Sequence, residues 1–166
     1  LARGYFFQAD AVFAPRAWRG RYPYSGAGDD ADATRRYQAA HRRGFISALR
    51  GLAARSREFE ERLQAGIDMD RAVLIVGKDA APLVYWYVAN LGRWARTAGT
   101  RALIRSRTGI LACLNHLRRI DAGTSYAGAD RLLGVYFAAV PGLFGGDLDR
   151  SRAHFEAALR IAPAYL

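Results

Sequence analysis

Apolar residues recur every three or four positions along most of the chain, the spacing that places side chains on one face of an α-helix. The pattern is clear between residues 33 and 55, where Tyr37 and Leu52 belong to the apolar stripe. Comparable stretches predict helices over 1–14, 56–66, 81–99, 100–120, 127–140 and 148–161. The first half of 81–99 is apolar nearly all round, which is typical of a helix at the centre of a helical fold.

The segment 68–77 is compatible with either a strand or a helix. Its AVLIV sequence is rich in β-branched residues, which favour strands. No second strand is predicted elsewhere to pair with it, so we interpret the segment as a buried helical turn. The sequence therefore predicts an all-α fold in a single domain, residues 1–166.

Proline, glycine and short acidic residues mark the breaks between these helices. The first helix is predicted to end near Pro15, and the segment 19–33, dense in Gly, Pro and Asp, is predicted to be a loop. Side chains placed to cap helix N-termini are Asp30 or Asp32, Asp79 and Asp147.

The second half of the chain contains a weak internal repeat. The pair Leu91-Gly92 recurs as Leu133-Gly134, 42 residues later. The stretches LLGVYF and HFEAALRIAP fit the tetratricopeptide pattern of Leu-Gly, an aromatic residue, then Phe, Ala and Pro, although the turn PGLFGG between them is about five residues too long. We therefore expect stacked antiparallel helical hairpins built on degenerate tetratricopeptide-like repeats, with glycine allowing close helix approach.

The net charge of +10 raises the question of an acidic partner. All basic residues except Lys78 are arginines, and they are spread along the chain rather than gathered in a stripe, which argues against a nucleic-acid-binding protein. The densest patch is RRYQAAHRR (35–43). It is either a solvated helix face or a surface that docks an acidic partner or an anionic membrane, and its arginines are Arg35, Arg36, Arg42 and Arg43.

The sequence contains no recognisable catalytic motif. It contains neither a GxSxG nor an HExxH motif, and its histidines have no partner at metal-ligand spacing. The one cysteine, Cys113, stands in an apolar context and is expected to be buried and inert. We therefore expect a protein that is not an enzyme and that needs no metal and no cofactor.

Several residues are candidates for ligand binding or for lining a channel. Three consecutive aromatic residues of one helix point in three directions, so they either pack against different helices or line a pocket. Two asparagines in apolar helical settings are either helix–helix hydrogen-bonding residues or ligand contacts. Two apolar residues of the PGLFGG turn either cap the hairpin core, close a channel mouth or contact a neighbouring subunit. The full set is Tyr85, Trp86, Tyr87, Asn90, Trp94, Asn115, Tyr136, Phe137, Leu143 and Phe144.

Three stretches of the chain resemble the TatT component of tetratricopeptide-associated TRAP transporters. They are ATRRYQAAHRRGFISALRG (33–51), LVYWYVANLGRW (83–94) and LLGVYFAAVPGLFGGDLDRSRAHFEAAL (132–159), of which the third is the most specific. The resemblance extends over most of the chain. None of the three stretches is catalytic, so the resemblance bears on fold and role.

The resemblance implies a periplasmic lipoprotein that forms a homotrimer, associates with the solute-binding subunit of a TRAP-type transporter and carries an apolar channel for hydrophobic ligands. Because the chain begins at Leu1 rather than methionine, we expect the signal peptide and the lipobox cysteine that carries the anchor to lie upstream. The alternative from the residues alone is a helical-repeat adaptor that binds proteins and no small molecule.

Overall fold

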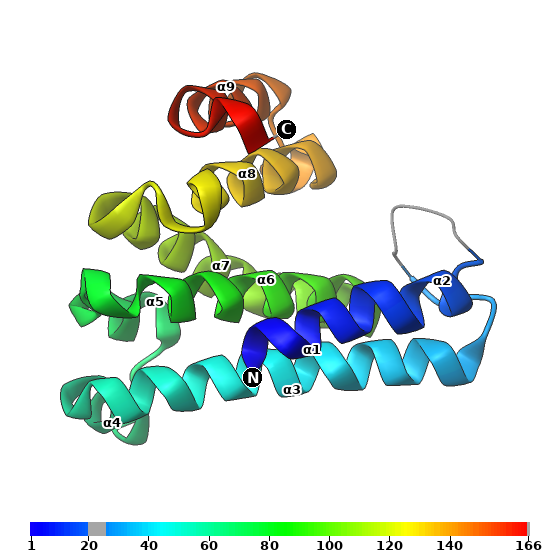
Figure 1. Ribbon diagram of the computed structural model, residues 1–166, viewed down its shortest axis with the longest axis horizontal. Helices are drawn as coiled ribbons and strands as arrows, with labels where there is room; N and C mark the ends of the chain where they lie inside the picture. The colour runs from blue at the N-terminus through cyan, green and yellow to red at the C-terminus, as the bar shows by residue number, and fades with distance from the viewer. Residues whose placement is uncertain (20–25, 166) are drawn as a thin grey trace.

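The structure is a computed structural model that describes residues 1–19 and 26–165, apart from the side chain of Phe144. Within that part the chain is helical and contains no strand, which confirms the predicted all-α fold (Figure 1). The long helices are α3 (Ala31–Arg55), α6 (Ala81–Ala98), α7 (Thr100–Asp121), α8 (Thr124–Ala139) and α9 (Leu148–Ile161).

The N-terminal helix continues past Pro15, so the predicted end there is wrong. Three segments run on from one another: α1 (Ala2–Gln8), the π-helical η1 (Ala9–Phe13) and α2 (Ala14–Ala17). At the end of η1 the amide of Ala14 donates to Ala9, five residues back, which is the wide turn of a π-helix. Pro15 falls in the first turn after it, where its missing N–H is tolerated.

Acidic N-caps begin two of the long helices, as the sequence predicts. The Asp30 carboxylate accepts from the amides of Asp32 and Ala33 at the start of α3, and Asp147 accepts from Arg150 at the start of α9. Asp79, by contrast, does not cap α6. It lies inside the 3₁₀ turn η3 (Lys78–Ala80), and its side chain bonds to Arg55 at 3.3 Å instead.

Short helical pieces connect α3 to α6. They are α4 (Arg57–Gln64), α5 (Met69–Ala72) and the 3₁₀ turn η2 (Val73–Ile75), followed by η3. The segment 68–77 therefore forms helical turns over residues 69–75 and no strand, as predicted. The same kind of turn appears as η4 (Gly142–Phe144) between α8 and α9 and as η5 (Pro163–Tyr165) after α9.

Helix α6 lies at the centre, as its nearly uniform apolar character predicts. It packs against α3 and α1 on one side and against α7 and α8 on the other, and α9 covers α8 (Figure 1). Helices α3 and α6 run antiparallel: Gln38 of α3 bonds to the carbonyl of Thr97, whereas Gly51 of α3 lies against Leu83 at the other end of α6.

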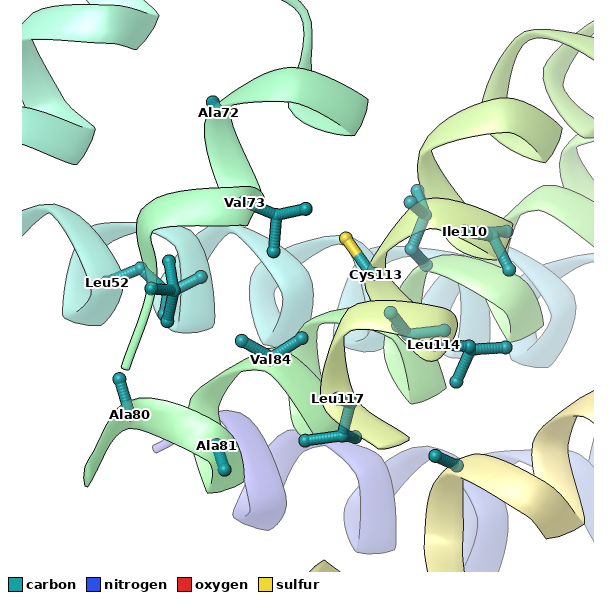
Figure 2. Close-up of a cluster of buried hydrophobic side chains, with 14 of the residues drawn as sticks. Leu52, Ala72, Val73, Ala80, Ala81, Val84, Ile110, Cys113, Leu114 and Leu117 are labelled. Carbon is teal, nitrogen blue, oxygen red and sulfur yellow. The ribbon is translucent and has the colours of Figure 1, made fainter. Parts of the chain in front are cut away.

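The main core forms where α3, α5, α6 and α7 meet (Figure 2). Leu52, Val84, Leu114 and Leu117 are among its fully buried side chains. Cys113 belongs to the same cluster, which confirms its predicted burial. Burial raises the pKa of the Cys113 thiol to about 12, so the sulfur stays protonated and unreactive in the folded protein.

The two Leu-Gly pairs of the predicted repeat pack differently. At Gly134 of α8 an added Cβ would lie 2.8 Å from the ring of Phe155, so this glycine admits the aromatic side chain of α9. At Gly92 of α6 the same construction meets no atom within 4 Å. Of the two Leu-Gly glycines, therefore, only Gly134 lies at a close approach between helices.

The entry to α8 is a turn of left-handed backbone. Ser125, Tyr126 and Ala127 have φ values of 53°, 58° and 56°, in the region that favours glycine. The Arg131 guanidinium donates to the carbonyls of Ser125 and Tyr126 at 2.7 and 2.5 Å. It also lies 4.0 Å from the centroid of Tyr165, whose ring stacks on Tyr126. One arginine thus holds the strained turn against the C-terminus.

Replacing Ser125 with glycine is expected to raise the free energy of unfolding by about 0.5 to 1 kcal/mol. Relief of the left-handed conformation is worth roughly 1–2 kcal/mol, and the greater freedom of glycine in the unfolded chain offsets part of it. Chemical denaturation measures the difference. The matched change Ser106→Gly, in the right-handed α7, should instead lower stability by roughly 0.5 to 1 kcal/mol. If both variants lose stability, the backbone at Ser125 is not strained.

Candidate functional site

The consecutive aromatic residues of α6 each meet a different helix. Trp86 faces α1, with its ring centroid 5.5 Å from that of Phe6. Tyr87 faces α3, where Phe45 lies at 6.3 Å. Tyr85 packs against Gly128 of α8 so closely that a Cβ there would overlap its ring. The three directions predicted from helix geometry are therefore occupied by three neighbouring helices.

All of these aromatic side chains are partly buried rather than sealed in the core. Trp94, like Tyr87, faces α3, and its ring centroid lies 5.5 Å from that of Phe45. Burial raises the pKa of the Tyr85 and Tyr87 hydroxyls above the ordinary value, so both remain neutral hydrogen-bonding groups. Such side chains combine an apolar body with a polar tip.

Tyr136 and Phe137 of α8 differ in surroundings although they are adjacent. The Tyr136 hydroxyl is buried and has no hydrogen-bond partner among the described residues. Phe137 is buried and contacts both the parallel ring of His154, 5.6 Å away, and the Arg150 guanidinium, 3.9 Å from its centroid. Tyr136 thus places an unsatisfied hydroxyl beside the core, whereas Phe137 is a packed core side chain.

Asn90 lies in a buried polar network that joins three helices. Its Nδ2 donates to the carbonyls of Ala2 and Trp86, at 3.2 and 2.8 Å. Its Oδ1 must therefore accept, and His41 Nδ1 lies 3.0 Å from it. The other ring nitrogen of His41 is 3.3 Å from Asp10 Oδ1. The amide of Asn90 is thus fully used within the protein, as the helix–helix interpretation expects.

Asn115 has the opposite environment. It is exposed on α7 and lines an open groove of about 570 Å³ that α7, α8 and α9 share. The lining residues are Asn115, Arg118, Arg119, Ala122, Asp130, Ala157, Arg160 and Ile161. The sequence analysis treats the two asparagines alike, but their surroundings differ. Asn90 is a buried structural residue, and Asn115 lines a groove.

The four candidate docking arginines lie on one exposed face of α3. Arg35 and Arg36 both pair with Asp32, at 3.3 and 2.6 Å. The bond from Arg36 holds the pKa of the Asp32 carboxyl below its ordinary value. Arg42 and Arg43 are exposed and have no ion pair within the described part of the chain. Positive charge on this face is therefore least compensated toward residues 42 and 43.

A second, smaller groove begins at the same face of α3. It has a volume of about 240 Å³, and Arg36 lines it. Its other lining residues are Phe13, Arg16, Asp30, Asp32 and Ala33.

Among proteins of known families, the chain matches the sequence model of the TRAP transporter T-component, over residues 22–165. The chain belongs to this T-component family. No curated protein matches it. The predicted relationship to the TatT component is therefore confirmed, and the chain is a component of a TRAP-type transport system rather than a member of a known enzyme family.

Two further observations concern membrane spans and metal sites in this T-component. None of the helices within residues 1–19 and 26–165 combines the length and the apolar character of a membrane span. The His, Cys, Asp and Glu side chains of those residues do not gather into a group of three that could hold a metal ion.

The turn between α8 and α9 exposes one of its two apolar candidates. Leu143 is 91% exposed, so it does not fold back to cap the hairpin core. The side chain of Phe144 lies outside the described residues. Leu143 thus remains a candidate for contact with another molecule, because an apolar side chain this exposed contributes nothing to the fold of its own chain.

Sequence reasoning missed the arginines of the larger groove. Arg118 and Arg119 occupy the last turn of α7, and Arg160 occupies the last turn of α9. Arginine in the last turn of a helix is common because it complements the helix dipole, so the sequence gives no reason to single these residues out. The signal that could have found them is that two predicted helices of the second half, 100–120 and 148–161, both end in arginines.

Proposed function

We propose that the chain is a non-enzymatic, periplasmic T-component that binds or channels a hydrophobic ligand and docks the solute-binding subunit of its TRAP-type system. The observation that carries this proposal is the aromatic helix α6 in a chain of this family. Its partly buried Tyr87 and Trp94 lie beside the core, and its partly buried Trp86 packs against Phe6 of α1. Partly buried tyrosine and tryptophan suit a ligand that is mostly apolar and has a polar end.

The Tyr136 hydroxyl supports the same proposal. A buried hydroxyl without a partner costs about 1–3 kcal/mol relative to a satisfied one. Tyr136 packs against the core cluster that Tyr85 and Trp94 of α6 also join. A ligand with one hydrogen-bonding group, placed along these side chains, would satisfy the hydroxyl while its apolar part contacts the rings.

Docking of the solute-binding subunit is assigned to the arginine face of α3. Arg42 and Arg43 offer two uncompensated guanidinium groups that an acidic surface could pair with. Arg35 and Arg36, already bound to Asp32, would extend that surface. Such pairs favour fast, oriented association between subunits that meet transiently.

Three parts of the proposal rest on the family relationship. They are the homotrimer, the periplasmic location and membrane attachment through an N-terminal lipid anchor. The exposed Leu143 is consistent with a contact between subunits. Native mass spectrometry of the purified protein tests the trimer directly and identifies any apolar compound that is released from it.

Replacing Trp86 or Tyr136 with alanine is expected to weaken binding of the neutral fluorescent probe N-phenyl-1-naphthylamine about tenfold. Each change removes an apolar contact, and a loss of about 1.4 kcal/mol corresponds to a factor of ten. Fluorescence titration measures the dissociation constant, and native mass spectrometry checks that each variant keeps its oligomeric state.

The matched control is Ile104→Ala, which removes an exposed apolar side chain from α7. It should leave probe binding unchanged. Equal binding by the control, Trp86→Ala and Tyr136→Ala would contradict a ligand site along these aromatic residues.

The second candidate function is a helical-repeat adaptor that binds a protein and no small molecule. It is favoured by the packing of Tyr85, Trp86 and Tyr87, each of which has a helix of the same chain as its neighbour. A protein that binds its partner subunit but neither co-purifies with an apolar compound nor binds the probe would establish the adaptor instead.

A further inference from the structure

The groove shared by α7, α8 and α9 combines positive charge with an apolar wall. Arg118, Arg119 and Arg160 contribute three guanidinium groups, and Asp130 contributes one carboxylate. Its volume of about 570 Å³ falls within the range of about 300–1,000 Å³ that is usual for small-molecule sites. Among the described residues, α6 contributes none of the lining, so this groove is separate from the aromatic helix.

Arg118 is held in place by a buried carboxylate. Its Nε lies 2.9 Å from Asp130 Oδ1, and Asp130 is only 2% exposed. The same oxygen is 2.8 Å from His154 Nδ1, which ties the carboxylate to α9 as well. Asp130 thus joins all three helices of the groove, and it compensates one of the three guanidinium charges.

Arg119 is held by a buried histidine. His116 is 5% exposed, and its Nε2 lies 2.8 Å from the carbonyl of Val76. A carbonyl can only accept, so Nε2 carries the proton and donates. Nδ1 of His116 is then free to accept from Arg119 Nη2, which lies 3.4 Å away. This bond orients the guanidinium without neutralising it.

Complementing the helix dipole does not account for this arrangement. Arginine at a helix end needs no buried partner to interact with the last carbonyls, because the dipole acts on it in any exposed rotamer. Here two consecutive arginines are each oriented by a buried side chain, and Arg160 of α9 joins them with no ion pair in the described part of the chain. Oriented guanidinium groups bind anions with less loss of side-chain freedom.

Apart from the uncharged polar Asn115, the remaining lining residues are apolar. These are Ala122, directly after α7, and Ala157 and Ile161 of α9. Ile161 is partly exposed, so its side chain is available to a bound molecule. A ligand that used the whole groove would place an anionic group on the arginines and an apolar body against these three side chains.

We propose that this groove binds a small organic anion, a carboxylate joined to an apolar body, with Arg119 and Arg160 pairing with the carboxylate and Arg118 completing the positive surface. The proposal does not depend on a ligand path along α6, because the two sets of residues are different. It predicts a second small-molecule site on the protein, distinguished from the first by its need for charge.

Octanoate is the probe, and calorimetric titration at low salt measures its dissociation constant. Octanoate should bind at one saturable site, at least tenfold more tightly than octanol or acetate. Octanol lacks the carboxylate that the arginines would bind, and acetate lacks the apolar chain that the apolar side chains would contact. Arg119→Gln and Arg160→Gln should each weaken octanoate binding about tenfold, the usual effect of losing a charged hydrogen bond. His116→Ala, which leaves both charges but releases Arg119, should also weaken it.

Two controls make the result specific. Arg105→Gln, elsewhere on α7, removes the same charge outside the groove. Trp86→Ala alters the aromatic helix and leaves the groove intact. The proposal is overturned if Arg105→Gln weakens binding as much as the groove variants, if acetate or octanol binds as tightly as octanoate, or if Trp86→Ala abolishes octanoate binding while the groove variants retain it. The last result would place octanoate at the aromatic helix and leave the proposed function standing.

Discussion

Replacing Asn90 with alanine is expected to lower the free energy of unfolding by about 3 kcal/mol. The change leaves the His41 ring, which is fully buried, without its partner at Nδ1, and it leaves the carbonyl of Ala2 without its donor. Each buried group left unsatisfied costs about 1–3 kcal/mol, and the small cavity adds to that cost. Because Ala2 and Asp10 belong to the N-terminal helix, its attachment to α3 and α6 should loosen first.

Equilibrium denaturation in urea measures the loss, and hydrogen exchange of residues 2–17 tests whether the N-terminal helix opens. Asn115→Ala is the matched control, the same substitution at an exposed position of α7. It should remain within about 0.5 kcal/mol of the unchanged protein. Equal effects of the two substitutions would show that the Asn90 network contributes no stability.

Replacing Gly134 with alanine is expected to lower the free energy of unfolding by about 2 kcal/mol. The added Cβ would lie 2.8 to 2.9 Å from three atoms of the Phe155 ring, so the ring must swing away and α9 must move with it. Overpacking of this kind typically costs about 1–3 kcal/mol, which exceeds the helix-propensity advantage of alanine over glycine.

Gly92→Ala should have the opposite sign. No atom lies within 4 Å of the added methyl group, so only the gain in helix propensity remains, up to about 1 kcal/mol. Thermal or chemical unfolding of both variants tests the pair. Stabilisation by both changes would mean that α8 and α9 are packed more loosely than the structure indicates.

Local features of the fold were predictable because they depend on residues close in sequence. Asp30 and Asp147 cap their helices through amides two or three positions away, so the spacing alone identifies them. The apolar stripe of α3 and the nearly uniform apolar character of α6 likewise predict an outer and a central helix. Errors arose where an irregular turn intervened: the π-helical turn before Pro15 and the 3₁₀ turn that contains Asp79.

Features that depend on contacts between distant helices were not predictable. Asn90 and Asn115 have similar apolar neighbours in sequence, and only the packing of α1 and α3 against α6 buries the first. Gly92 and Gly134 each follow a leucine, 42 residues apart, but only Gly134 lies against an aromatic ring from another helix, and the sequence around the two glycines does not distinguish them. The arginine groove combines the ends of α7 and α9 with the middle of α8, so no single stretch carries its signature.

The burial of Cys113 gives the protein an intrinsic reporter of core opening. It is the one cysteine of the chain, and it lies among the side chains that join α6 to α7. A thiol reagent can reach the sulfur only when these helices separate, since the folded state neither exposes nor ionises it. The rate of labelling under native conditions therefore measures how often the centre of the molecule opens, and a ligand that tightens the helices would be detected as a slower rate without any added dye.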